Sequence, residues 1–241
     1  MTLSSATNVA SVTISAPEAA LAGGRRPRRL PMQLLAMLVS VALAGCTGLF
    51  HSNARPDQVY LLRALPSSAD SSAPAPLGVS LRLTHPTAAP GLDTPQIVLV
   101  QSDRRMSFYL ASRWPAPAPN MVETLAVEKL RGSGLWQSVA DSASAFPTDY
   151  VIQVMMRRFE ADYTGGGPAP DVHVVLDCIV GKRAGREVIA SFLAEGTATA
   201  SANKLSAVVA AFETATNAAL DSLSMQTAAA VRTAAARKDS E

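Results

Sequence analysis

Three segments between residues 150 and 200 alternate between apolar and polar side chains, and this pattern constrains the fold more than any other part of the chain. The apolar positions are Tyr150, Ile152, Val154 and Met156, then Val172, Val174, Leu176, Cys178 and Val180, then Val188, Ala190, Phe192 and Ala194. A period of two is typical of strands that bury one face. Turn residues separate the segments, including a triple glycine at 165–167. We therefore expect an antiparallel meander, with a bulge near Arg158 because Phe159 breaks the alternation.

After Leu205 the apolar period changes to that of a helix. One stripe is formed by Val208, Phe212, Ala215, Ala219 and Leu223. We expect this long C-terminal helix to cover the apolar face of the meander. Beyond Met225 the chain is rich in alanine and threonine, so residues 226–241 are expected to fray as a C-terminal tail.

Shorter elements are expected before the meander. Apolar or alternating runs predict strands at 58–65, 77–84, 96–101, 106–111 and 136–140. Met121–Arg131 has a helical period, Asn120 and Glu123 suggest a capping box, and Gly132 is the expected stop. The predicted class is α/β of the α+β type. A single domain at 58–225 is expected to combine a mostly antiparallel sheet, a short amphipathic helix and the long C-terminal helix.

The N-terminal region has the pattern of an export signal. Four arginines between Arg25 and Arg29 precede an apolar run, Leu34–Ala44, which ends in the small residues before Cys46. Leu43-Ala44-Gly45-Cys46 resembles the lipobox of bacterial lipoproteins, which predicts cleavage before Cys46 and a lipid on its thiol. Residues 1–45 are then a signal peptide and residues 46–57 a tether. The run is shorter than the roughly 20 residues of a membrane-spanning helix, which makes a retained anchor the weaker alternative. Export by the twin-arginine route is a further, minor alternative.

The formal charge of +2 is dominated by these arginines, and the chain from Cys46 onward is nearly balanced. It gives no support to nucleic-acid binding, which needs a clustered basic surface. If Cys46 carries a lipid, Cys178 is the one remaining cysteine. Because Cys178 alternates in phase with buried positions, we expect an inert core thiol rather than a nucleophile.

Catalytic and metal-binding patterns are missing from the sequence. The three histidines lack the spacing of metal ligands, and no Gly-x-Ser-x-Gly elbow occurs. The triple glycine lacks the lysine of a phosphate-binding loop and is interpreted as a hairpin turn. We therefore expect no catalytic residues, no metal and no cofactor, and a protein that is not an enzyme. Trp114, amid prolines, is either a partner-binding aromatic or a packing residue.

The order of features resembles the ABC-type transport auxiliary lipoproteins, the paraquat-inducible type included. The resemblance covers Cys46 to about Met225. Beyond the lipobox it is carried by Tyr60-Leu61-Leu62, by Leu92-Asp93-Thr94-Pro95-Gln96-Ile97-Val98, by Trp114-Pro115-Ala116-Pro117, by Arg158-Phe159-Glu160 and by Val208-Val209-Ala210-Ala211-Phe212. In two places the chain departs from the family pattern: Thr94 stands for an arginine and Ala116 for an acid.

The resemblance implies a periplasmic domain that a lipid holds at the outer membrane. It implies an MCE-domain protein as partner, served by a permease and an ATPase, in the transport of lipids or hydrophobic compounds. Candidate residues for the family motif or partner contact are Tyr60, Leu92, Pro95, Gln96 and Trp114. A homo-oligomer is left open. The alternatives are a lipoprotein that docks on and regulates an envelope-building enzyme, and a lipid-anchored hydrolase.

Overall fold

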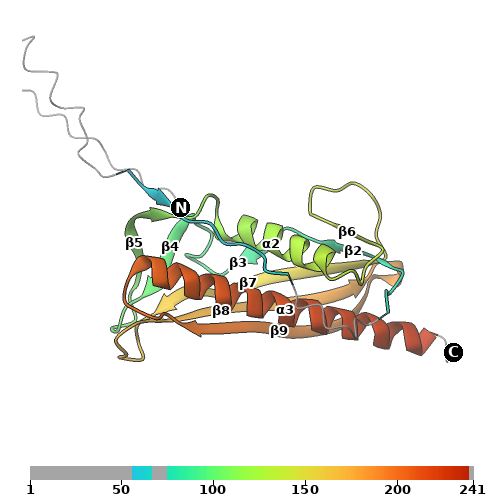
Figure 1. The fold of residues 1–241 in the computed structure, drawn as a ribbon. Helices are drawn as coiled ribbons and strands as arrows, with labels where there is room; N and C mark the ends of the chain where they lie inside the picture. The colour runs from blue at the N-terminus through green and yellow to red at the C-terminus, as the bar shows by residue number, and fades with distance from the viewer. Residues whose placement is uncertain (1–55, 67–74, 239–241) are drawn as a thin grey trace, which may run out of the picture. The chain divides into compact units, whose positions relative to one another are not determined.

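The computed structural model describes residues 56–66 and 75–238. In this part of the chain, nine strands form one mixed sheet, and two helices lie across one of its faces (Figure 1). The strands are β1 (Gln58–Val59), β2 (Ser80–Leu83), β3 (Thr87–Ala88), β4 (Gln96–Val100), β5 (Met106–Arg113), β6 (Ser138–Ala140), β7 (Tyr150–Asp162), β8 (Asp171–Lys182) and β9 (Glu187–Thr199). The helices are α2 (Ala118–Gly132) and α3 (Leu205–Lys238), and a 3₁₀ turn, η1 (Ala184–Arg186), precedes β9. The predicted α+β class is confirmed. The proposed signal peptide and nearly all of the tether lie outside the described residues.

The meander of β7, β8 and β9 is confirmed as antiparallel. The bulge expected near Arg158 is present, because the register between β7 and β8 shifts between Met156 and Arg158. A second shift, between Val180 and Gly181, was not expected. An extra residue in one strand moves the following side chains to the opposite face. The prediction that Val188 points inward is therefore wrong, and its side chain is 63% exposed.

The long strand β7 organises the rest of the sheet. Along the edge away from β8 it pairs in turn with β2, β3 and β4, and all three pairings are parallel and short. Beyond them, β5 pairs antiparallel with β4, while β1 and β6 are parallel neighbours of β5 and β2. The extensive pairings are thus antiparallel, as predicted, and the short parallel ones join distant parts of the chain.

Helix α3 covers β8 and β9 with the predicted stripe, whose five residues are all buried. The expectation that the chain frays beyond Met225 is wrong for residues 226–238, which continue the helix. The reason is packing, since Thr227, Ala228 and Val231 extend the buried stripe by about two more turns. Alanine also has the highest intrinsic helix propensity, so the composition of this segment favours a helix.

Helix α2 begins earlier than predicted, and the capping box is wrong. Pro117 occupies the N-cap, Pro119 lies in the first turn, and no side chain caps the helix. A proline at the first turn has no N–H that needs a partner, which explains how the helix begins without a cap. Glu123 instead accepts hydrogen bonds from the Ser142 N–H and the His85 ring. The C-terminal turn uses the positive φ of Gly134, not Gly132.

The strand predicted at 58–65 is also wrong beyond β1. We call residues 60–66 the strap. Its first N–H, on Tyr60, donates to the Arg113 carbonyl, 2.9 Å away. The next peptide groups bond to side chains of both helices: Arg63 and Leu65 to Glu213 and Asn217 of α3, and Leu65 to Lys129 of α2. The helices thus satisfy the backbone that a neighbouring strand would otherwise pair.

Candidate functional site

The five candidates from the sequence meet around one end of β5. The backbone N–H of Trp114 donates to the Pro95 carbonyl at 2.7 Å. Gln96 is the register partner of Arg113, whose carbonyl also accepts the backbone N–H of Tyr60. Leu92 closes the turn before β4, because its carbonyl accepts the Thr94 N–H. Leu92 and Trp114 are buried, Tyr60 and Pro95 are half-buried, and Gln96 is exposed. This junction joins the strap, the turn and the start of α2.

Trp114 lies fully buried in an aromatic cluster with Phe159 of β7 and Phe212 of α3. Its ring centroid is 6.0 Å from that of Phe159 and 5.3 Å from that of Phe212, and both pairs meet edge to face. Such pairs stabilise a core beyond the area they bury. Of the two alternatives for Trp114, packing onto the domain is the one that this geometry describes.

The sheet face opposite α2 and α3 carries no helix among the described residues, and we call it the open face. Near the β7–β8 turn this face is polar. There Arg158 bonds to Glu160 and Asp162, each at 2.7 Å. Toward the β8–β9 hairpin it becomes apolar, and the large exposed side chains are Met155, Ile179, Val188 and Leu193. The open face therefore combines a network of ion pairs with an uncovered apolar area.

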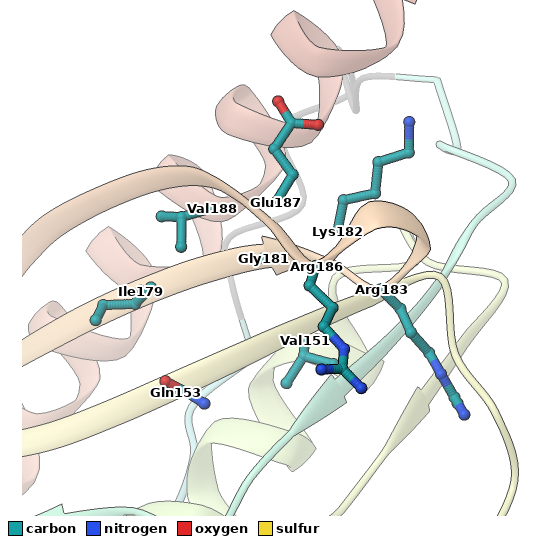
Figure 2. A pocket seen from close by; sticks show the side chains of 9 residues that line it. All are labelled: Val151, Gln153, Ile179, Gly181, Lys182, Arg183, Arg186, Glu187 and Val188. Carbon is teal, nitrogen blue, oxygen red and sulfur yellow. The ribbon is translucent and has the colours of Figure 1, made fainter.

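The apolar end of the open face is hollowed. This hairpin hollow encloses about 400 Å³ and is lined by Val151, Gln153, Ile179, Gly181, Lys182, Arg183, Arg186, Glu187 and Val188 (Figure 2). Figure 2 shows the Arg186 and Arg183 side chains running toward the β7 side of the hollow, whereas Lys182 and Glu187 point the other way. An aliphatic floor thus lies beside two guanidinium groups.

The sequence interpretation missed this hollow. The cluster Lys182-Arg183 with Arg186 predicted only a polar hairpin. The bulge that turns Val188 onto the same face has no local sequence signal. The floor of the hollow forms where Val151 of β7 pairs with Gly181 of β8, a contact that only the strand register reveals.

The titratable groups show no catalytic arrangement within the described ranges. Burial raises the pKa of the Cys178 thiol to about 12, as expected of an inert core cysteine. His173 of the open face lies 3.3 Å from the Thr197 hydroxyl. In the residues that can be described, no group of three histidine, cysteine or acidic side chains is placed to hold a metal. Across the same residues, neither helix is both long and apolar enough to cross a membrane.

A family model described as the ABC-type transport auxiliary lipoprotein component matches residues 60–224. The chain belongs to this family. The resemblance stated from the residues alone is confirmed. The matched residues begin at Tyr60 and end in α3, so they include the strap, the junction and the strands of the open face.

Solved structures agree with the fold of this auxiliary lipoprotein. A crystal structure of a DUF330-family protein from Xanthomonas campestris is 26% identical, with a TM-score of 0.65, and the match covers 74% of this chain and 99% of that protein. A second crystal structure, of an uncharacterized protein, is 12% identical with a TM-score of 0.51, covering 71% and 97% of the two chains. The curated proteins that were searched give no match.

Proposed function

We propose that this chain is a periplasmic lipoprotein, held at the outer membrane by a lipid on Cys46. We propose that it serves an ABC transporter through an MCE-domain protein, in the movement of lipids or hydrophobic compounds between membranes. The observation that carries the proposal is the family match over residues 60–224. The family description supplies the lipoprotein character and the ABC transporter. The MCE partner, the membrane and the cargo are our extension of it.

The anchor is tested by replacing each cysteine in turn. We expect Cys46→Ser to leave an uncleaved precursor that incorporates no labelled fatty acid. Cys178→Ser is the matched control, because this thiol is buried on β8 and its loss should leave cleavage and labelling intact. Labelling of the Cys46→Ser protein at the level of the wild type would remove Cys46 as the lipidation site.

We further propose a docking role without catalysis. The one described thiol is buried and its raised pKa keeps it protonated at neutral pH. The exposed side chains include several large apolar ones. On β5, Met106, Phe108 and Leu110 project at alternate positions, and Leu110 is 93% exposed. Exposed apolar rows of this kind mark surfaces that contact other proteins or membranes.

The partner is tested by extracting the lipoprotein with mild detergent and identifying the proteins that co-purify. We expect the MCE-domain protein, and we expect Leu110→Lys to reduce its recovery. Phe146→Lys is the control, because Phe146 is also a strongly exposed apolar residue, on the loop before β7. Recovery of a cell-wall synthesis enzyme in place of the MCE protein would favour the regulatory alternative. Equal loss with both variants would exclude β5 as a specific contact.

A further inference from the structure

The floor of the hairpin hollow exposes aliphatic surface that the fold itself does not use. Val188 of β9 is 63% exposed and Ile179 of β8 is 38% exposed. Both line the hollow on the open face, together with Val151 of β7. Met155 and Leu193 are also exposed on the same face, on either side of Asp177. Burying such a surface against an apolar ligand is favourable in proportion to the area removed from water.

The guanidinium groups beside this floor are available to an anion. Across the described residues, Arg183 and Arg186 form no ion pair with a carboxylate, in contrast to Arg157 and Arg158 farther along the face. Figure 2 places both side chains on the same side of the hairpin as Gln153 and Val151. An unpaired guanidinium offers donors in a fork that suits a phosphate or carboxylate.

The backbone of the hairpin holds Arg186 in an unfavourable conformation. Its φ is +53°, directly after Gly185 at +79°. Glycine adopts this region at little cost, whereas a residue with a side chain does not. The chain therefore carries an arginine where glycine would suit the turn better. A strained residue beside an exposed apolar hollow is the kind of outlier that points to function.

We propose that the hairpin hollow binds an anionic phospholipid, with the phosphate at Arg183 and Arg186 and the first part of an acyl chain on Val151, Ile179 and Val188. The volume of about 400 Å³ lies within the range of small-ligand sites. It accommodates the head-group region and the first part of an acyl chain, and the rest of the lipid extends beyond the hollow. A nucleic acid fits less well, because the lining contains no aromatic side chain on which a base could stack. All residues of the site belong to this chain, so lipid binding can be tested independently of the MCE partnership.

The test uses the mature lipoprotein in nanodiscs of phosphatidylcholine, without partner proteins. Gln153→Cys carries a bimane label in the hollow, and the buried Cys178 stays unlabelled because burial raises its pKa. Dihexanoyl phosphatidylglycerol, below its micelle concentration, is the probe. Dihexanoyl phosphatidylcholine and glycerol 3-phosphate are the comparisons. We expect a saturable fluorescence change with phosphatidylglycerol, about tenfold weaker binding of phosphatidylcholine, and no response to glycerol 3-phosphate.

Two arginines at positive φ provide a matched pair of variants. Arg186→Gly should weaken binding of phosphatidylglycerol about tenfold. Arg104, at φ +66° in the turn before β5, is absent from the hollow lining, and Arg104→Gly should leave binding unchanged. Both changes relieve the same backbone strain, so the melting temperature should not fall in either. Equal binding of phosphatidylcholine, binding of glycerol 3-phosphate as tight as that of the lipid, or equal loss with Arg104→Gly would each overturn the proposal.

Discussion

Gly196 allows α3 to touch β9, and replacing it with alanine tests the packing of the two layers. A Cβ atom at this position would lie 1.9 Å from the Ala215 carbonyl oxygen and 2.8 Å from the Ala219 nitrogen. Both atoms belong to the helix backbone, so no side-chain rotation can relieve the overlap. The helix or the strand must move as a whole.

Overpacking a core typically costs about 1–3 kcal/mol. We expect Gly196→Ala to reach or exceed the upper end, about 3 kcal/mol, because the clash is with backbone. This is a large share of the roughly 5–15 kcal/mol that stabilises a folded protein. For a domain of this size it corresponds to a fall in melting temperature of about 6–12 °C.

The measurement is urea and thermal unfolding of the mature lipoprotein, followed by circular dichroism. Gly181→Ala is the control on the neighbouring strand β8, where the new Cβ would meet its nearest atom, the Glu187 carbonyl oxygen, at 3.4 Å. Gly132→Ala, at the end of α2, has open space around it and should be neutral or stabilising. A Gly196→Ala protein within about 0.5 kcal/mol of the wild type would refute the close contact between α3 and β9.

Three further changes probe other parts of the domain. Trp114→Ala should cost about 3–5 kcal/mol in urea unfolding, because it empties the centre of the aromatic cluster. A hydrogen bond from the Ser80 hydroxyl, supported by the Ser80 N–H, lowers the pKa of Asp149 below its usual 3.8. The stability from this depressed pKa is present above that value and is lost as the pH falls through the folded pKa, so Asp149→Asn should flatten the acid limb of unfolding. Lys129→Ala removes a donor from the Leu65 carbonyl, and hydrogen exchange of the strap should accelerate while that of β8 stays unchanged.

The sequence predicted those parts of the fold in which burial of one face produces a repeating pattern among neighbouring residues. The alternation of Val172 to Val180 and the stripe from Val208 to Leu223 are local patterns, and both are buried as expected. The bulge at Arg158 was also visible, because Phe159 interrupts the period. These features depend only on which side of a strand or helix faces the core.

The remaining features depend on contacts between distant residues. The strap bonds Arg63 to Glu213, a separation of 150 residues, and nothing near residue 63 indicates this partner. The short parallel pairings of β2, β3 and β4 with β7 are equally remote. The floor of the hairpin hollow depends on the register of β7 against β8 and on the register shift between β8 and β9 at Gly181. Its arginines could be read from the sequence, but their aliphatic neighbours could not.

The strap determines how the domain would bear a mechanical load. Tension applied to the chain before Pro56 reaches β1 first, and then the strap. Beyond Tyr60 its hydrogen bonds lead to Glu213 and Asn217 of α3 and to Lys129 of α2, rather than to another strand. A pull on the chain before Pro56 would therefore load the pairing of β1 with β5 first and then both helices.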